Sequence, residues 1–393
     1  MSQWVLGKLG DIAEIVMGQS PIGESVNTNG FGTPLLNGPT EFTIRYPKAV
    51  QFSTDPKKFS KVHDILFCVR GSTTGRMNWA NEVYAIGRGL AAIRHKQGKE
   101  YRYFVKAILD YYLDTMLASA SGSTFPNVSK DQLNDLEISY PSLPEQKAIA
   151  SVLSSLDDKI DLLHRQNKTL EAMAETLFRQ WFIEEAKDDW EESDLTQLIS
   201  LQSGYAFKSK DFQEQGNFGV IKIKNISGNI IDIEQTDFVS NDVGLATAQH
   251  FYLESGQVLI AMTGAEIGKL GLVPKTNKKL LLNQRVGLLQ PCFKGAEYLA
   301  YLHLKSEYGQ DYIENSATGS AQPNISGSLI EACPFPKIDN LFLKQCGEHV
   351  HIYYEKVKEN LGQIQTLEKL RDTLLPKLMS GQVRVEYKRV DAA

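Results

Sequence analysis

Several residue groups in this 393-residue chain resemble catalytic or ligand-binding motifs, but each lacks part of the motif. Residues 264–269, Gly-Ala-Glu-Ile-Gly-Lys, resemble a phosphate-binding loop whose spacing is one residue short, and Leu270 stands where Ser or Thr is required. Residues 87–92 fit a dinucleotide-binding fingerprint loosely, without the strand–helix unit and the downstream acidic residue that it needs. His349 and His351 are two apart on an expected helix and face different ways, which disfavours a metal site.

Composition narrows the class of protein further. No nucleophile–base pair occurs at corresponding positions in the two halves of the chain. The chain also contains no Pro-Pro and therefore lacks the motif of amino-methyltransferases, so we do not expect an enzyme. A hydrophobic content of 42% with 23% charged residues predicts folded domains rather than disorder. Four distant cysteines, no signal-peptide pattern and no long apolar run predict a cytoplasmic protein without a zinc site. The net charge of -5 permits nucleic-acid binding only through a locally positive face.

The chain contains two copies of one plan. Residues 122–129, Gly-Ser-Thr-Phe-Pro-Asn-Val-Ser, recur 197 positions later as Gly-Ser-Ala-Gln-Pro-Asn-Ile-Ser at 319–326. Residues 71–76 correspond to 264–269, and Gly18 corresponds to Gly204 at a shorter offset. This ordered series of matches predicts a tandem duplication.

Each copy combines a globular part with a long helix. Apolar runs at 64–69 and 257–262 predict buried strands that end in glycine turns, and helices are expected at 103–116 and near 298–308. We therefore predict an α+β fold with domains at residues 1–142 and 186–340. Long helices follow at residues 143–185 and 341–380, and a polar tail occupies 381–393.

Both long helices carry the heptad pattern of a coiled coil. Their expected apolar seams run from Ile149 to Trp181 and from Cys346 to Leu378. Two like units are most simply related by a twofold axis, which predicts an antiparallel helix pair. With the axis at mid-helix, the expected cross-helix pairs are Asn167 with Asn360, Trp181 with Cys346, and Ala174 with Tyr353. Leu156 would then face Arg371, the one unfavourable layer.

Taken in this order, the motifs resemble the specificity (S) subunit of type I restriction–modification systems over essentially the whole chain. The resemblance rests on the repeated Gly-Ser-x-x-Pro-Asn-Val/Ile-Ser and on Leu-Pro-Glu-Gln-Lys-Ala-Ile-Ala at 143–150. It also rests on Gly-Lys-Leu-Gly-Asp-Ile at 7–12 and Ile-Lys-Ile-Lys-Asn-Ile at 221–226. The second half departs from the pattern, because Leu-Phe-Leu-Lys-Gln at 341–345 replaces a clean Pro-Glu-Gln-Lys and weakens the signal for a helix start.

The resemblance implies a non-catalytic DNA-recognition subunit. Its two globular domains would be target-recognition domains, each reading half of an interrupted double-stranded DNA site. The helices would set the gap between the halves and dock two modification (M) subunits. Those subunits would carry S-adenosylmethionine and methylate adenine, and restriction (R) subunits would join for cleavage.

The candidate DNA contacts lie in loops at strand ends, where side chains reach base edges and phosphates. In the first domain they are Arg70, Ser72, Thr73, Arg76, Arg88, Gln19, Ser20 and Asn37. In the second domain they are Thr263, Lys269, Arg285, Lys224, Asn225 and Gln284. Arg88 and Arg285 are expected to correspond across the repeat. Because the first domain holds six arginines and the second only Arg285, we predict a more G·C-rich first half-site.

Two other functions remain open from the sequence. A structural coiled-coil scaffold would show no salt-dependent binding to DNA. A self-contained DNA methyltransferase or nuclease would need a cofactor-binding core, which the sequence does not reveal.

Overall fold

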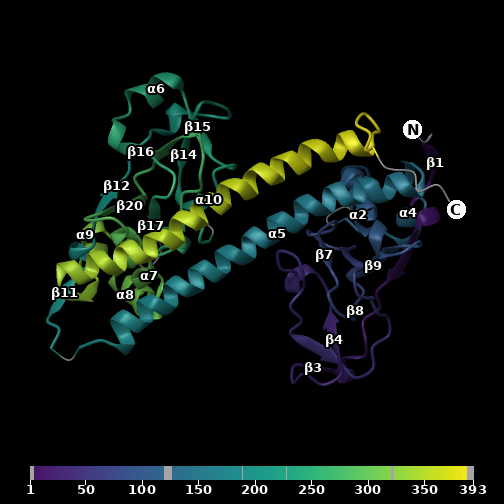
Figure 1. The fold of residues 1–393 in the computed structure, drawn as a ribbon, viewed down its shortest axis with the longest axis horizontal. Coiled ribbons are helices and arrows are strands. Elements are labelled where there is room, and N and C mark those ends of the chain that lie inside the picture. Colours follow the sequence, from purple (N-terminus) through teal and green to yellow (C-terminus); the bar gives the residue numbers. More distant parts are fainter. Residues whose placement is uncertain (1–3, 119–125, 188, 227, 320–322, 387–393) are drawn as a thin grey trace. The chain divides into compact units, whose positions relative to one another are not determined.

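The computed structural model describes residues 4–118, 126–187, 189–226, 228–319 and 323–386. The chain forms two compact units, one comprising residues 1–161 with 367–393 and the other residues 162–366 (Figure 1). Each unit therefore contains the globular part of one repeat together with a segment of each long helix. No helix within the described ranges has the length and apolar character needed to cross a membrane.

The first unit is built on two four-stranded sheets. One sheet has the order β2 (Ala13–Met17), β9 (Leu90–His95), β6 (Ile65–Cys68), β7 (Met77–Trp79). The other has the order β3 (Val26–Asn27), β5 (Gln51–Ser53), β4 (Thr33–Leu36), β8 (Ala85–Ile86). Strands β1 (Val5–Lys8) and β10 (Glu137–Tyr140) form an antiparallel pair. The shorter helices are α1 (Leu9–Ile12), α2 (Arg102–Tyr111), α3 (Leu113–Ala118) and α4 (Lys130–Asn134).

The second unit repeats this plan with small changes. Its four-stranded sheet has the order β12 (Ile199–Ser203), β20 (Val286–Pro291), β17 (Val258–Ala261), β18 (Leu270–Leu272). Its five-stranded sheet has the order β13 (Phe212–Gln213), β15 (Asp237–Val239), β14 (Phe218–Ile221), β19 (Lys279–Leu282), β16 (Tyr252–Leu253). Strands β11 (Glu192–Asp194) and β21 (Pro334–Pro336) pair, and the shorter helices are α6 (Asn241–Ala246), α7 (Ala296–Lys305), α8 (Glu307–Ser316) and α9 (Gly327–Glu331).

The helix predicted over residues 103–116 is two helices, and so is its counterpart. Tyr112 leaves helical geometry between α2 and α3, with φ -97° and ψ 9°. In the second unit Ser306 has ψ 161° and ends α7, while its Oγ accepts a hydrogen bond from the Gly309 N–H and so caps α8. The apolar pattern continues across both breaks, which is why periodicity alone suggested one helix.

The two long helices are present, as predicted. Helix α5 (Leu143–Arg179) continues into a π-helical turn at Gln180–Glu184, and α10 spans Asn340–Met379. In the first unit, Leu378 and Met379 of α10 share one apolar core with residues near the start of α5. In the second unit, the Asn360 Nδ2 donates to the Asn167 Oδ1 at 2.8 Å. Within each unit the helix segments therefore run antiparallel.

Two layers of the helix pair contain contacts that were not predicted. The Trp181 ring stacks on the His349 ring, one turn from its expected partner Cys346, with centroids 5.9 Å apart. Arg371, expected opposite Leu156, instead donates through Nη1 to the Asp157 carboxylate at 3.1 Å. The layer that looked unfavourable is thus an ion pair. Tyr353 is only half-buried, whereas the adjacent Tyr354 is buried against Tyr298.

Candidate nucleic-acid interface

The loop that follows β2 in the first unit and the loop that follows β12 in the second make equivalent backbone contacts. In the first unit the Gly18 N–H donates to the Leu90 carbonyl at 2.8 Å, and the Gln19 N–H to the Ile86 carbonyl at 2.9 Å. In the second unit the Tyr205 N–H donates to the Leu282 carbonyl at 2.8 Å. This loop therefore lies directly beside the turn that precedes β9 or β20.

The repeated glycine in this loop is required by the close approach of two backbones. A Cβ on Gly18 would lie 2.1 Å from the Gly87 carbonyl oxygen, and a Cβ on Gly204 would lie 2.4 Å from the Asn283 carbonyl oxygen. No side chain fits at either distance. The pair of glycines seen in the sequence thus marks where the two loops of each unit meet.

Four of the predicted contacts in the first unit lie together at this meeting point. The Arg88 N–H donates to the Ser20 Oγ at 3.3 Å, and Gln19 precedes Ser20 on the same loop. Asn37 packs against Gly87, where a Cβ would lie 2.3 Å from the Asn37 Oδ1. Gln19, Ser20, Asn37 and Arg88 are all exposed, so their side chains are accessible to a ligand.

The other four predicted contacts occupy the loop between β6 and β7. The Gly75 N–H donates to the Cys68 carbonyl at 2.9 Å, which closes the loop that carries Arg70, Ser72, Thr73 and Arg76. The Val69 N–H donates to the Gly89 carbonyl at 2.9 Å and joins this loop to the Arg88 turn. We call these eight residues the first loop cluster. Its three arginines are exposed and form no ion pair with any carboxylate of the described residues.

The repeated Pro-Asn segment holds this loop in place. The Gly71 N–H donates to the Pro126 carbonyl at 3.3 Å, and the Arg70 Nε donates to the Asn127 Oδ1 at 3.2 Å. The second unit repeats the arrangement, because the Gly264 N–H donates to the Pro323 carbonyl at 2.8 Å. The Pro-Asn segment therefore fixes the conformation of the loop through hydrogen bonds. Residues 122–125 and 320–322 of the repeated motif lie outside the described residues.

The serine that ends the motif caps the helix that follows. The Ser129 Oγ accepts from the Gln132 N–H, and the Gln132 side chain accepts from the Ser129 N–H, so the two residues form a capping box. In the second unit the Ser326 Oγ accepts from the Leu329 N–H.

The expected correspondence of Arg88 with Arg285 is wrong by one residue. The Leu90 N–H bonds to the Gly87 carbonyl, whereas the equivalent Val286 N–H bonds to the Asn283 carbonyl. Strand pairing agrees, because Met17 pairs with Ala91 and Ser203 pairs with Gly287. Gln284 therefore takes the place of Arg88, and Arg285 takes the place of Gly89.

Three lysines at the matching surface of the second unit are already paired. Lys222 and Lys224 both contact the Asp237 carboxylate at 2.7 Å, and Lys269 pairs with Glu266. Burial by itself would raise the pKa of Asp237, but hydrogen bonds from both lysines lower it, so the carboxylate remains charged. The predicted contacts Lys224 and Lys269 consequently have part of their charge neutralised within the protein.

Asn225 was predicted to contact DNA, and this prediction is wrong. Its side chain is only 1% exposed. The Nδ2 donates to the carbonyls of Asp232 and Gln235, at 3.0 and 3.1 Å, and the Oδ1 accepts from the Lys222 N–H. Asn225 thus organises its own loop. The Thr263 Oγ1 is also buried, and it has no partner among the described residues.

Sequence reasoning missed two residues of this surface. Tyr205 occupies the place of Gln19, and Lys222 follows β14 as Asn37 follows β4. The offset that relates Gly18 to Gly204 also relates Gln19 to Tyr205, so the signal was present in the sequence. We call Tyr205, Lys222, Lys224, Lys269, Gln284 and Arg285 the second loop cluster.

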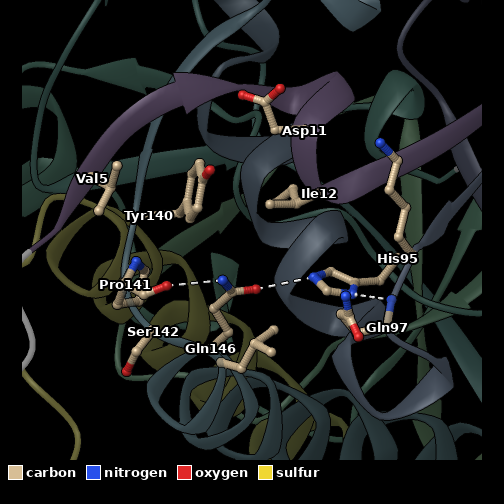
Figure 2. Close-up of a pocket in the computed structure, with 11 residues that line it drawn as sticks. Val5, Asp11, Ile12, His95, Gln97, Tyr140, Pro141, Ser142 and Gln146 are labelled. Atoms are coloured by element: carbon tan, nitrogen blue, oxygen red, sulfur yellow. Dashed lines mark hydrogen bonds between the residues drawn. The ribbon is translucent and has the colours of Figure 1, made fainter.

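A polar chain of contacts joins the far end of β9 to the start of α5. The His95 Nδ1 accepts from the Gln97 N–H at 3.0 Å, so Nε2 carries the proton and donates to the Gln146 Oε1 at 3.0 Å (Figure 2). The Gln146 Nε2 in turn donates to the Pro141 carbonyl at 2.9 Å. Burial lowers the pKa of His95, and the hydrogen bond to Gln146 opposes this shift only in part. The lowered pKa keeps the imidazole neutral.

These contacts line a cavity of about 340 Å³ and explain the Glu-Gln pair at 145–146 (Figure 2). Glu145 is also buried and accepts two hydrogen bonds from the Arg384 guanidinium, at 2.5 and 2.6 Å. Both side chains therefore anchor the first turn of α5. In the described part of the chain, no three His, Cys, Asp or Glu side chains gather as they would around a metal ion.

Comparisons with known proteins agree with the fold. The M. genitalium S subunit of a type I restriction–modification system has a crystal structure that matches with a TM-score of 0.64 at 19% identity, covering 96% of each chain. The MjaIX specificity subunit of a type I restriction enzyme from Methanocaldococcus jannaschii is 26% identical over 98% of this chain and 94% of its own length. The HindI specificity subunit of Haemophilus influenzae is 23% identical over 68% of this chain and 73% of its own length.

The sequence profile of the type I restriction modification DNA specificity domain matches residues 1–172 and 187–336. The match occurs twice and covers most of both repeats. The resemblance found in the sequence motifs is confirmed: the chain belongs to the family of type I restriction–modification DNA specificity subunits.

Proposed function

We propose that this chain reads an interrupted double-stranded DNA site, with the first loop cluster on one half and the second loop cluster on the other. The chain is a recognition subunit rather than an enzyme, in line with the specificity subunits that it resembles. The observation that carries the proposal is that one hydrogen-bonded pair of loops is built twice on a duplicated fold, with different exposed side chains each time.

The chemistry of each cluster supports a different half-site. Arg70, Arg76 and Arg88 offer bidentate donors of the kind that read guanine in the major groove. The second cluster has one arginine, and its lysines are paired with carboxylates. The first half-site is therefore expected to be richer in G·C pairs.

Partners complete the activity in this proposal. Modification and restriction subunits associate with a specificity subunit of this family, and we propose two modification subunits, one for each repeat. These would supply S-adenosylmethionine and transfer its methyl group to adenine. The long helices would set the gap between the two half-sites, and with the surfaces around their ends they would dock the modification subunits.

A methylation map tests the proposal directly. The chain is expressed with its cognate modification subunit in cells without other adenine methylation, and the modified positions are sequenced. We expect methylated adenines in a two-part motif with a fixed gap. A soluble, verified complex that adds no methylation would contradict DNA recognition, and one uninterrupted motif would contradict the reading by two domains.

A further inference from the structure

We infer that Tyr205 is a base-reading residue of the second loop cluster, with its ring against the 5-methyl group of a thymine in the second half-site. The inference rests on the proposed function and adds to it a residue and the chemical group that this residue recognises. Apolar contact with the thymine methyl group is one of the ways in which proteins distinguish bases in the major groove.

The position of Tyr205 follows from its backbone contacts. Its N–H donates to the Leu282 carbonyl at 2.8 Å, and its carbonyl accepts from the Gln284 N–H at 3.0 Å. Gly204 permits this approach, because any Cβ there would overlap the Asn283 carbonyl. Tyr205 is thereby fixed beside Gln284, whose counterpart in the first unit is Arg88.

The ring of Tyr205 is held in place and yet accessible. It packs edge-on against Phe207 and Phe251, with centroids 4.9 and 5.5 Å away, while 42% of the residue remains exposed. The Gln202 Nε2 donates to the His250 carbonyl at 2.6 Å and fastens the loop that carries Phe251. A ring positioned before binding loses little conformational freedom when it meets a ligand.

The neighbours of Tyr205 include two side chains of the kind that read base edges. Gln284 and Arg285 are exposed, and the Asn283 Oδ1 accepts from the Arg285 N–H at 3.3 Å, which shapes the turn that presents them. Glutamine pairs in a bidentate way with adenine, and arginine pairs with guanine. An apolar ring beside a glutamine therefore fits an A·T pair, whose thymine carries the methyl group.

The test uses the complex with the modification subunits and synthetic DNA in which single thymines of the second half-site are replaced by deoxyuridine. Uracil pairs as thymine does but lacks the methyl group. Wild-type complex is expected to bind at least one substituted duplex about fourfold more weakly, the factor that corresponds to one buried methylene-sized group.

Substitutions of Tyr205 test whether this loss of affinity comes from its ring. Tyr205→Ala is expected to bind thymine and uracil duplexes equally, whereas Tyr205→Phe keeps the discrimination because it retains the ring. Tyr308→Ala is the matched control, since Tyr308 is an exposed tyrosine of α8 in the same unit. Thymines replaced in the first half-site should affect wild type and Tyr205→Ala alike.

Failure of this inference is distinct from failure of the proposed function. If wild type methylates a two-part site but Tyr205→Ala still discriminates thymine from uracil, the role of Tyr205 is wrong and the proposed function stands. The same conclusion follows if the second half-site contains no A·T pair. If wild type methylates no two-part site, the proposed function fails and the inference fails with it.

Discussion

At the scale of single residues, the two loop clusters differ mainly in which cations are paired with a carboxylate. Arg70, Arg76 and Arg88 face solvent without an acidic partner among the described residues, while Lys224 and Lys269 of the second unit are paired with Asp237 and Glu266. A cation already held by a carboxylate gains less from a phosphate or a base edge, because the existing pair must first be broken.

Arg88→Ala is expected to weaken binding to the first half-site by about 10- to 100-fold, the range for one bidentate arginine–guanine contact. Competition binding of the complex to duplexes with altered half-sites measures the change. Arg102→Ala is the control, because the Arg102 guanidinium packs over the Trp79 ring and lies outside the cluster. Unchanged preference at every position of the first half-site would refute a base-reading role for Arg88.

His303 predicts how stability depends on pH in the second unit. Burial lowers the pKa of His303 to about 4, although its hydrogen bond to the Pro334 carbonyl opposes the shift. The unfolded chain binds a proton near pH 6.5, so His303 contributes stability above that pH, and this contribution is lost as the pH falls towards 4. The full effect is about 3 kcal/mol.

His303→Gln keeps an N–H donor but does not titrate. We expect urea unfolding of the variant to lose less stability between pH 7 and pH 4.5 than unfolding of the wild-type chain. Parallel losses in the two proteins would show that another group is responsible.

At the scale of elements, the buried Asn167–Asn360 pair distinguishes the two long helices from an apolar coiled coil. One hydrogen bond of 2.8 Å joins the pair, while the Asn167 Nδ2 and the Asn360 Oδ1 have no partner among the described residues. Such a pair specifies the register of two helices at the expense of stability.

A double-mutant cycle tests this balance. Asn167→Leu or Asn360→Leu alone leaves a buried polar group unpaired, so each is expected to lower the free energy of unfolding by about 1–3 kcal/mol. The double variant removes both groups and should equal or exceed the wild-type stability. Chemical denaturation of all four proteins gives the coupling, and additive losses would contradict the expectation.

At the scale of the whole molecule, duplication supplies two recognition domains with one architecture and different surfaces. Strand order, loop docking and helix caps recur, whereas Gln284 replaces Arg88 and Tyr205 replaces Gln19. The backbone frame can therefore stay constant while the bases recognised change, since sequence is read by side chains at base edges.

For the whole molecule, we predict that the length of the two long helices sets the gap between the half-sites. Insertion of seven residues into both α5 and α10 at facing positions keeps the heptad seam and lengthens each helix by about 10 Å. The gap in the methylated motif should grow by about 3 base pairs with both half-sites unchanged. Insertion of three residues, which breaks the seam, serves as the control, and an unchanged gap after the seven-residue insertion would contradict a spacer role.

The sequence by itself determined the features that are encoded in residue type, spacing and repetition. The duplication, the heptad seams of α5 and α10, the Ser129 capping box and the Asn167–Asn360 contact could all be predicted from residue type and spacing. Helix periodicity and helix capping depend on residues a few positions apart, so they can be read from one sequence. The duplication can be read from the same sequence because its two halves can be compared with each other.

Only the tertiary structure decided which candidate residues are accessible. Asn225 has the composition of a loop contact, but residues 7 and 10 positions further along the chain accept its amide hydrogens. The charge of Lys224 is partly neutralised by Asp237. The register of β12 with β20 shows that Gln284, and not Arg285, is equivalent to Arg88. Burial, ion pairing and strand register depend on which neighbours the fold brings together, and residue spacing does not identify those neighbours.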